Sequence, residues 1–88
     1  MKQSEGCYIC GYPYTEVHHI FYGTGNRKLS DEYGLTVRLC ARHHRDYRDG
    51  VHGCNKELDY YLRRKGQEAF KEAYPDLDFI KLFGSNYL

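Results

Sequence analysis

The spacing of the cysteines constrains this chain more than any other feature. Two residues separate Cys7 from Cys10, and two residues separate Cys40 from His43. Two ligands at this spacing can grip one ion from a tight turn, and three thiolates with one imidazole form a closed tetrahedral set for structural zinc. Gly11 tolerates the positive φ that such turns often need. We therefore expect a structural zinc at Cys7, Cys10, Cys40 and His43.

The fourth cysteine, Cys54, leaves alternatives open. It could replace His43 as the fourth ligand, although the C-x2-H spacing favours His43 because it can form a second compact knuckle. Four cysteines could also form two disulfides in a secreted domain. No apolar leader is visible at the N-terminus, so we expect a cytoplasmic compartment, where disulfides are rare. A chain of 88 residues also needs a staple, because its core is small.

Composition excludes a membrane-spanning chain and says little about partners. The mean hydropathy is −0.79 and no apolar run is long enough to cross a bilayer. Thirteen Lys and Arg residues stand against twelve Asp and Glu, a net charge of +1. The charge is uneven, however, because bases outnumber acids over residues 26–48. Nucleic acid is therefore neither indicated nor excluded by charge alone.

The rest of the pattern predicts a small α+β domain in which helices cover an antiparallel hairpin. Runs of β-branched and aromatic residues indicate the two strands, and paired glycines indicate the loop between them. Apolar residues at helical spacing indicate the long helix. The expected elements are strands over 15–22 and 35–39, a loop over 23–31, helices over 41–49 and 55–74, a turn over 50–54 and a short last helix.

Capping residues set the expected ends of the C-terminal helices. Asn55 is a good N-cap for the long helix and Pro75 ends it, while Gly66 is a weak position within it. Asp76 can cap the last helix. The residues of this segment expected to face the core are Leu77, Phe79, Ile80 and Phe83.

Five histidines cluster in the same part of the chain as the cysteines: His18, His19, His43, His44 and His52. Since neighbouring side chains in a strand point to opposite faces, the first pair can enter one site only if the strand ends or bulges there. A divalent ion beside a neutral imidazole can catalyse hydrolysis, because the metal stabilises charge and the imidazole takes a proton from water. The alternatives are an exposed strand pair, a second candidate zinc ligand at His44 and a turn residue without a role at His52.

Four segments in order carry a resemblance to a known family: CYICG (7–11), EVHHI (16–20), LCARHH (39–44) and GVHGCN (50–55). This set resembles the zinc-stapled HNH endonucleases of the ββα-metal, or His-Me finger, class, particularly small phage and prophage proteins. The resemblance implies one HNH-type domain over 1–88. Its zinc-stapled, treble-clef-like ββα-metal core would span 7–55, and 55–88 would be a helical extension.

The resemblance also implies roles for the remaining histidines. His18 would be a ligand of a catalytic metal, His19 the general base and His44 a second ligand, borne on a helix. Many family members have the last ligand at the position of Arg48, which cannot bind a cation. His52 is therefore the expected substitute, with Asn55 as a fallback.

The asparagine that orients the base in the family is missing here. It should fall near Leu35 or Thr36, and neither is Asn. Thr36 or a backbone carbonyl would then have to orient His19.

The expected activity is metal-dependent hydrolysis of phosphodiester bonds in duplex or branched DNA, with Mg²⁺, Mn²⁺ or another divalent transition metal. Phage packaging or recombination proteins are possible partners by the same resemblance, and no membrane is involved. The main alternative is a non-catalytic zinc module that binds nucleic acid or protein. Basic residues could contact phosphates, although they could also be a solvated face. They are Arg27, Lys28, Arg42, Arg45 and Arg48.

Overall fold

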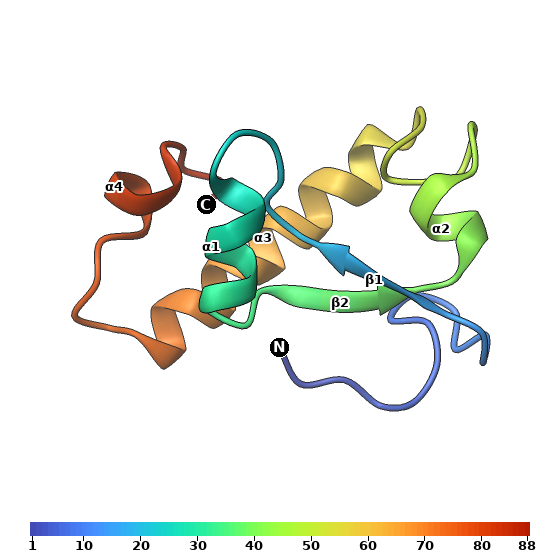
Figure 1. The fold of residues 1–88 in the computed structure, drawn as a ribbon, viewed down its shortest axis with the longest axis horizontal. Coiled ribbons are helices and arrows are strands. Elements are labelled where there is room, and N and C mark those ends of the chain that lie inside the picture. The colour runs from blue at the N-terminus through green and yellow to red at the C-terminus, as the bar shows by residue number, and fades with distance from the viewer.

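The computed structural model describes residues 1–88 and confirms the α+β class. Strands β1 (Glu16–His19) and β2 (Thr36–Leu39) form the predicted antiparallel pair, in which His18 lies opposite Val37. In Figure 1, α2 lies at one end of this pair and α1 and α4 at the other. The helices are α1 (Asn26–Glu32), α2 (Ala41–Arg45), α3 (Lys56–Ala73) and α4 (Phe79–Phe83).

Helix α1 occupies part of the segment that we expected to be a loop, and that prediction was wrong. Gly25 begins the helix with a φ of 82°, a conformation that suits glycine. Ser30 is fully buried, and its hydroxyl donates to the carbonyl of Phe21 at 2.7 Å and accepts from the Phe21 N–H at 3.1 Å. A tertiary contact therefore fixes this helix against the end of β1.

Two other helix boundaries also differ from the prediction. Helix α2 ends at Arg45 because the carboxylate of Asp46 accepts hydrogen bonds from the backbone N–H groups of Arg48 and Asp49, which closes a turn. The last helix is capped by Asp78, whose side chain accepts from the backbone N–H of Lys81. The expected cap at Asp76 was therefore wrong.

The long helix α3 matches its prediction closely. The side chain of Asn55 accepts from the backbone N–H of Leu58, as an N-cap should. Gly66 is a close-packing position in this helix, because a Cβ there would lie 2.9 Å from the ring of Phe21. The interpretation of Gly66 as merely a weak position missed this packing role.

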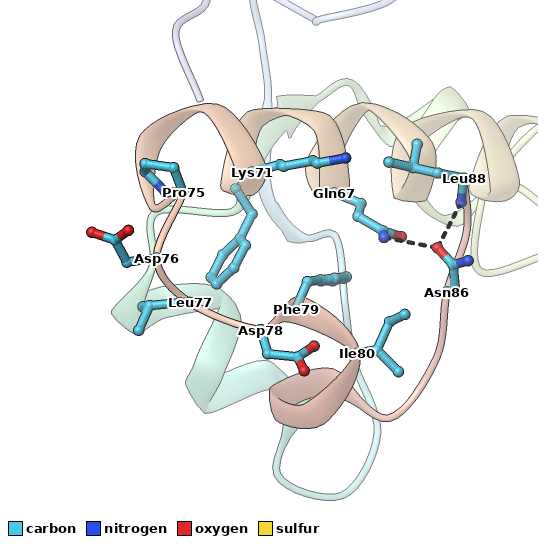
Figure 2. A pocket seen from close by; sticks show the side chains of 11 residues that line it. Gln67, Lys71, Pro75, Asp76, Leu77, Asp78, Phe79, Ile80, Asn86 and Leu88 are labelled. Carbon is cyan, nitrogen blue, oxygen red and sulfur yellow. Dashed lines mark hydrogen bonds between the residues drawn. The ribbon is translucent and has the colours of Figure 1, made fainter.

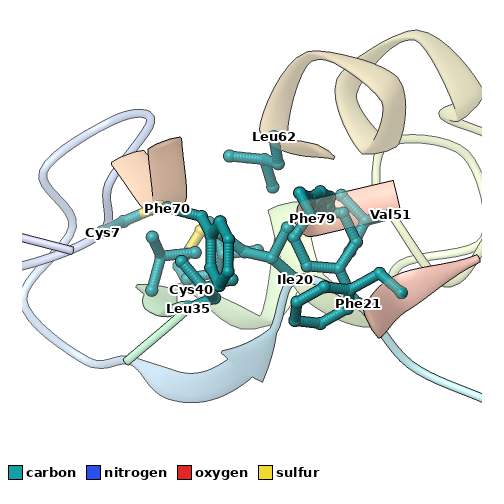
Figure 3. Packing of buried hydrophobic residues seen from close by; sticks show 12 residues of the cluster. Cys7, Ile20, Phe21, Leu35, Cys40, Val51, Leu62, Phe70 and Phe79 are labelled. Carbon is teal, nitrogen blue, oxygen red and sulfur yellow. The ribbon is translucent and has the colours of Figure 1, made fainter. Parts of the chain in front are cut away.

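The core lies between the strand pair and the C-terminal helices (Figure 3). Rings of Phe21 and Phe83 have centroids 4.9 Å apart, and those of Phe70 and Phe79 are 5.4 Å apart. Phe79 and Phe83 are buried as expected, whereas Leu77 and Ile80 are exposed, which corrects half of that prediction.

The C-terminal tail is a strap across α3. Gln67 accepts from the backbone N–H of Tyr87 at 2.7 Å and donates to the side chain of Asn86 at 2.9 Å. This strap holds the ring of Tyr87 5.5 Å from that of Phe21.

Candidate metal centres

The structure brings together the four residues that the cysteine spacing predicts: Cys7, Cys10, Cys40 and His43. The sulfurs of Cys10 and Cys40 are 3.8 Å apart, and Nδ1 of His43 lies 3.3 Å from the Cys40 sulfur and 3.8 Å from the Cys7 sulfur. A regular tetrahedron with zinc–sulfur bonds of about 2.3 Å has edges of about 3.8 Å. The donor set and its spacing therefore fit structural Zn²⁺.

Two turns at one end of the strand pair, one before β1 and one after β2, build this Cys3His cluster. Gly11 has a φ of 79°, and its N–H donates to the carbonyl of Cys7 at 2.8 Å, which closes the first knuckle. Cys40 is the N-cap of α2, and His43 lies on that helix. Because Tyr8 also donates its N–H to the carbonyl of Arg38, the knuckle is fixed against the end of β2.

The same local geometry favours the ionised form of one thiol. Burial raises the pKa of the Cys7 thiol, but backbone hydrogen bonds from Cys40, Cys10 and Ile9 outweigh burial and lower this pKa to about 6. Burial, with the neighbouring thiols, raises the pKa of Cys40. A thiolate ligand therefore forms most readily at Cys7, and the others follow as protons are released on metal binding.

The structure supports neither alternative for the cysteines, which were two disulfides or Cys54 as the fourth zinc ligand. All four cysteines are free, and the 3.8 Å between the sulfurs of Cys10 and Cys40 is far from the disulfide bond length of about 2.05 Å. Cys54 is exposed and lies outside the cluster.

A second cluster joins three of the histidines from separate parts of the chain: His18, His44 and His52. One ring nitrogen from each lies within 4.8 Å of the others, and the ring centroids are 4.8 to 5.2 Å apart. The structure therefore brings together the three residues expected to bind a second metal, including the substitute ligand. We call these three residues the histidine triad.

His18 is the most informative member of the triad. It is 1% exposed, and neither ring nitrogen has a hydrogen-bond partner. A buried polar group without a partner costs about 1–3 kcal/mol, so such a group calls for a ligand or another explanation. Burial, together with the charges that His52 and His44 would carry, lowers the pKa of His18 to about 3. The imidazole is therefore neutral near pH 7, with a lone pair free for a metal.

The turn after α2 places His52 beside His44. The N–H of Val51 donates to the carbonyl of His43, and the N–H of His52 donates to the carbonyl of His44 at 3.0 Å. Gly50 is needed at this turn because a Cβ there would lie 2.6 Å from backbone atoms of Asp46. Val51 is fully buried, which anchors the turn in the core.

A carboxylate that the sequence did not point to holds His44. Glu16, at the start of β1, lies 2.8 Å from Nδ1 of His44. The hydrogen bond from His44, followed by that from Arg45, lowers the pKa of the Glu16 carboxyl. An ionised carboxylate can only accept, so Nδ1 carries the proton and Nε2 has the free lone pair. This is the arrangement in which proteins commonly orient a metal-binding histidine.

His19 lies next to the triad but outside it. Its Nε2 is 2.8 Å from Oδ1 of Asp31, on α1. The side chain lines a cavity of about 270 Å³ that also includes two members of the triad. The residues lining this cavity are Val17, His19, Tyr22, Arg27, His44 and His52. The strand ends at His19, which lines this cavity, whereas His18 belongs to the triad beside it.

Behind the cavity, Tyr22 is held by a partly buried ion pair. Its hydroxyl donates to Asp59 at 3.0 Å, and Arg63 also bonds to Asp59 while stacking over the Tyr22 ring. The Tyr22 ring lies 4.9 Å from that of His52. Nothing in the sequence pointed to Asp59 or Arg63, since an acid and a base four residues apart on a helix are usually a surface pair.

Two of the five expected phosphate-contacting residues are already paired with acids. Arg42 donates to Asp49 at 3.0 Å, and Arg45 donates to both carboxylate oxygens of Glu16. Both arginine side chains are largely exposed. Their charge is thus partly balanced locally.

The other three basic residues make no ion pair. Arg27 lines the cavity beside the histidines, whereas Lys28 and Arg48 are exposed. Arg48 follows the end of α2, so it lies outside the helix that was expected over 41–49. Arg27 is therefore the positively charged residue best placed to contact a phosphate in the cavity.

A larger cavity, of about 540 Å³, lies elsewhere (Figure 2). It is formed by the end of α3, by α4 and by the C-terminal tail, and no histidine or cysteine lines it. Its chemistry is that of an ordinary groove between helices. The candidate site is therefore assigned by its chemistry and not by cavity size.

The fold and the two clusters define a small α+β domain with a Cys3His metal-binding cluster and a separate histidine triad. Comparisons with protein-family models, with curated proteins and with solved structures find no match to this chain. None of its helices has both the length and the apolar character needed to span a membrane.

Proposed function

We propose that this protein is a metal-dependent endonuclease of the HNH type, which hydrolyses phosphodiester bonds of DNA. The observation that carries the proposal is the buried His18 imidazole, which has no hydrogen-bond partner and faces His44 and His52. His19 stands on the wall of the adjoining cavity. The order of these residues along the chain resembles that of the family.

The triad would hold a divalent ion through three imidazole nitrogens. Three protein ligands leave coordination positions open, as in catalytic sites. A bound ion would neutralise charge on the scissile phosphate and stabilise the leaving oxygen. Imidazole suits zinc, nickel, iron or copper, whereas Mg²⁺ prefers oxygen ligands. We therefore expect transition metals to support activity better than Mg²⁺.

The chain supplies a base and a phosphate contact beside this position. His19 would take the proton of the attacking water, a role that suits imidazole near neutral pH. Arg27, which lines the same cavity and has no acidic partner, would contact a phosphate next to the scissile one. The Cys3His cluster would have a structural role, because four protein ligands leave no open position.

The substrate and the setting follow from the resemblance. Duplex or branched DNA is the proposed substrate, with phage packaging or recombination proteins as proposed partners. Because Arg42 and Arg45 are paired with acids, binding by charge alone should be weak and should fall with salt. One active site cuts one strand, so a monomer should nick duplex DNA.

A plasmid-nicking experiment tests the proposal. Supercoiled DNA is incubated with the wild-type protein and with His19→Ala, each carrying a defined metal content, in Zn²⁺, Ni²⁺, Mn²⁺ or Mg²⁺. We expect nicking by the wild type and a loss of about 10²–10⁴-fold in the variant. Cutting by both proteins alike would remove His19 from the base role.

The absence of cutting with every metal would contradict the endonuclease proposal. A protein that holds one zinc, binds no second metal and cuts nothing would instead support a non-catalytic zinc module that binds nucleic acid or protein. A binding measurement with the same DNA separates these outcomes, since a binding module retards DNA without cutting it.

A further inference from the structure

We infer that Asp31 positions His19 for catalysis, in place of the asparagine that the sequence lacks. This inference rests on the proposed endonuclease function and deepens it. From the sequence, Thr36 or a backbone carbonyl was the group expected to orient His19. The structure instead places Oδ1 of Asp31 2.8 Å from Nε2 of His19, and Thr36 makes no hydrogen bond with this ring.

The contact selects one tautomer of the imidazole. An ionised carboxylate accepts hydrogen bonds and cannot donate, so Nε2 of His19 must carry the proton. Nδ1 then has the lone pair and has no partner within the protein. The His19 side chain lines the cavity with His44 and His52. In the proposed arrangement, the Nδ1 lone pair would face the attacking water there.

This arrangement would serve the attack of water on the scissile phosphodiester bond. Nδ1 of His19 takes a proton from water while the water oxygen forms a bond to phosphorus. The bond from phosphorus to the leaving oxygen breaks, and that oxygen takes a proton from solvent. The imidazolium formed at His19 is stabilised by the carboxylate of Asp31 until it returns its proton to solvent.

Helix α1 holds Asp31 in a defined place. The adjacent Ser30 is fully buried and makes two hydrogen bonds to the backbone of Phe21, which lies two residues after His19. The helix and the histidine are therefore joined through a short, rigid connection. Arg27 lies four residues before Asp31, on the same helix face, and lines the cavity. One face of α1 thus supplies both the carboxylate and a phosphate contact.

A plain surface ion pair is the competing explanation, because the Asp31 side chain is 65% exposed. Exposed pairs contribute little to stability, typically less than about 1 kcal/mol. Loss of a surface pair alone would leave turnover unchanged. The two explanations therefore differ in what Asp31 does to the rate.

The test compares Asp31→Ala and Asp31→Asn with the wild type, and uses Glu32→Gln as the matched control. Glu32 is the next residue on α1, is exposed and makes no ion pair. Steady-state nicking gives kcat and KM separately, metal analysis gives the content of each site, and ¹⁵N NMR of the imidazole reports the His19 tautomer.

We expect Asp31→Ala to lower kcat about tenfold or more with KM and metal content unchanged. Asp31→Asn should fall in between, because its amide oxygen can accept the hydrogen bond but carries no charge. The ¹⁵N signals of His19 should change from one fixed tautomer to a mixture in Asp31→Ala. Glu32→Gln should match the wild type.

If the wild type cuts DNA and Asp31→Ala retains its kcat within about twofold, the role of Asp31 is overturned and the endonuclease proposal stands. If the wild type does not cut, both fall. Unchanged ¹⁵N signals in Asp31→Ala would show that the pair does not set the tautomer, whatever the activity.

Discussion

The Cys3His cluster and the histidine triad share helix α2 but differ in chemistry. His43 belongs to the first cluster and His44 to the second. Successive residues of a helix point about 100° apart, so one short helix can serve two sites on different sides. The first cluster offers three thiolates and an imidazole, and the second offers only imidazoles beside a cavity.

This difference separates a structural metal site from a site that can bind substrate. Four ligands close the coordination sphere of zinc, whereas three leave room for water or substrate. The thiolates also bind soft and borderline metals strongly, whereas imidazoles accept several divalent ions. The first cluster should therefore decide whether the chain folds, and the second should decide what the folded chain can do.

The largest effect should come from the Cys3His cluster. Cys40→Ser removes a ligand from the cluster, and structural zinc contributes apparent free energies of about 10–16 kcal/mol in zinc-finger peptides. We expect this variant to lose its bound zinc and its cooperative thermal transition, measured by zinc analysis and circular dichroism. Cys54→Ser, at the exposed cysteine outside the cluster, should retain both. Equal melting of the two variants would contradict a structural role for the cluster.

A second prediction separates the two neighbours on α2. His44→Ala should weaken binding of the second metal by more than about 100-fold and leave one zinc in a folded chain. His43→Ala should instead affect the zinc of the Cys3His cluster. Metal titration by calorimetry, on protein already loaded with one zinc, measures both. Loss of the same ion from both variants would merge the two sites into one.

A smaller effect is expected at the carboxylate that orients His44. Glu16→Gln should weaken metal binding by the triad by about 10–100-fold, because an amide does not fix the tautomer as a carboxylate does. Asp49→Asn is the control, since Asp49 also pairs with an arginine but contacts no histidine. An affinity equal to that of the wild type in Glu16→Gln would exclude the orienting role.

The smallest expected effect is the loss of folding stability in mild acid that His18 causes. Folded His18 has a pKa of about 3, below the ordinary value of 6.5, so the unfolded chain takes up its proton first as the pH falls. The contribution of His18 is therefore fully present above pH 6.5 and is lost below it, by about 1 kcal/mol at pH 6. Urea unfolding of protein with one zinc measures this slope.

His18→Leu is the comparison for that measurement. It retains the other titrating groups of the chain, so the difference in slope between pH 7.5 and pH 6 belongs to His18. A slope as steep as that of the wild type would show that His18 is not buried in its neutral form.

The parts of the fold that local signals govern could be predicted. Asn55 caps α3 through a bond to Leu58, and such a contact within four residues can be read from the sequence. Helix α1 could not be predicted in this way, because the buried hydroxyl of Ser30 and its bonds to Phe21 stabilise it against β1. Gly66 was misread for the same reason, since the ring that it accommodates comes from a distant residue.

The sequence by itself pointed to the four residues of the Cys3His cluster, because the spacing within each pair lies inside one turn, although it left Cys54 as an alternative to His43. It also named all three histidines of the triad as candidates. Only the tertiary structure decided that these three meet, and that Glu16 and Asp31 support two of the site histidines from 28 and 12 residues away. Contacts over such separations depend on how the strands and helices pack, and no local spacing encodes them.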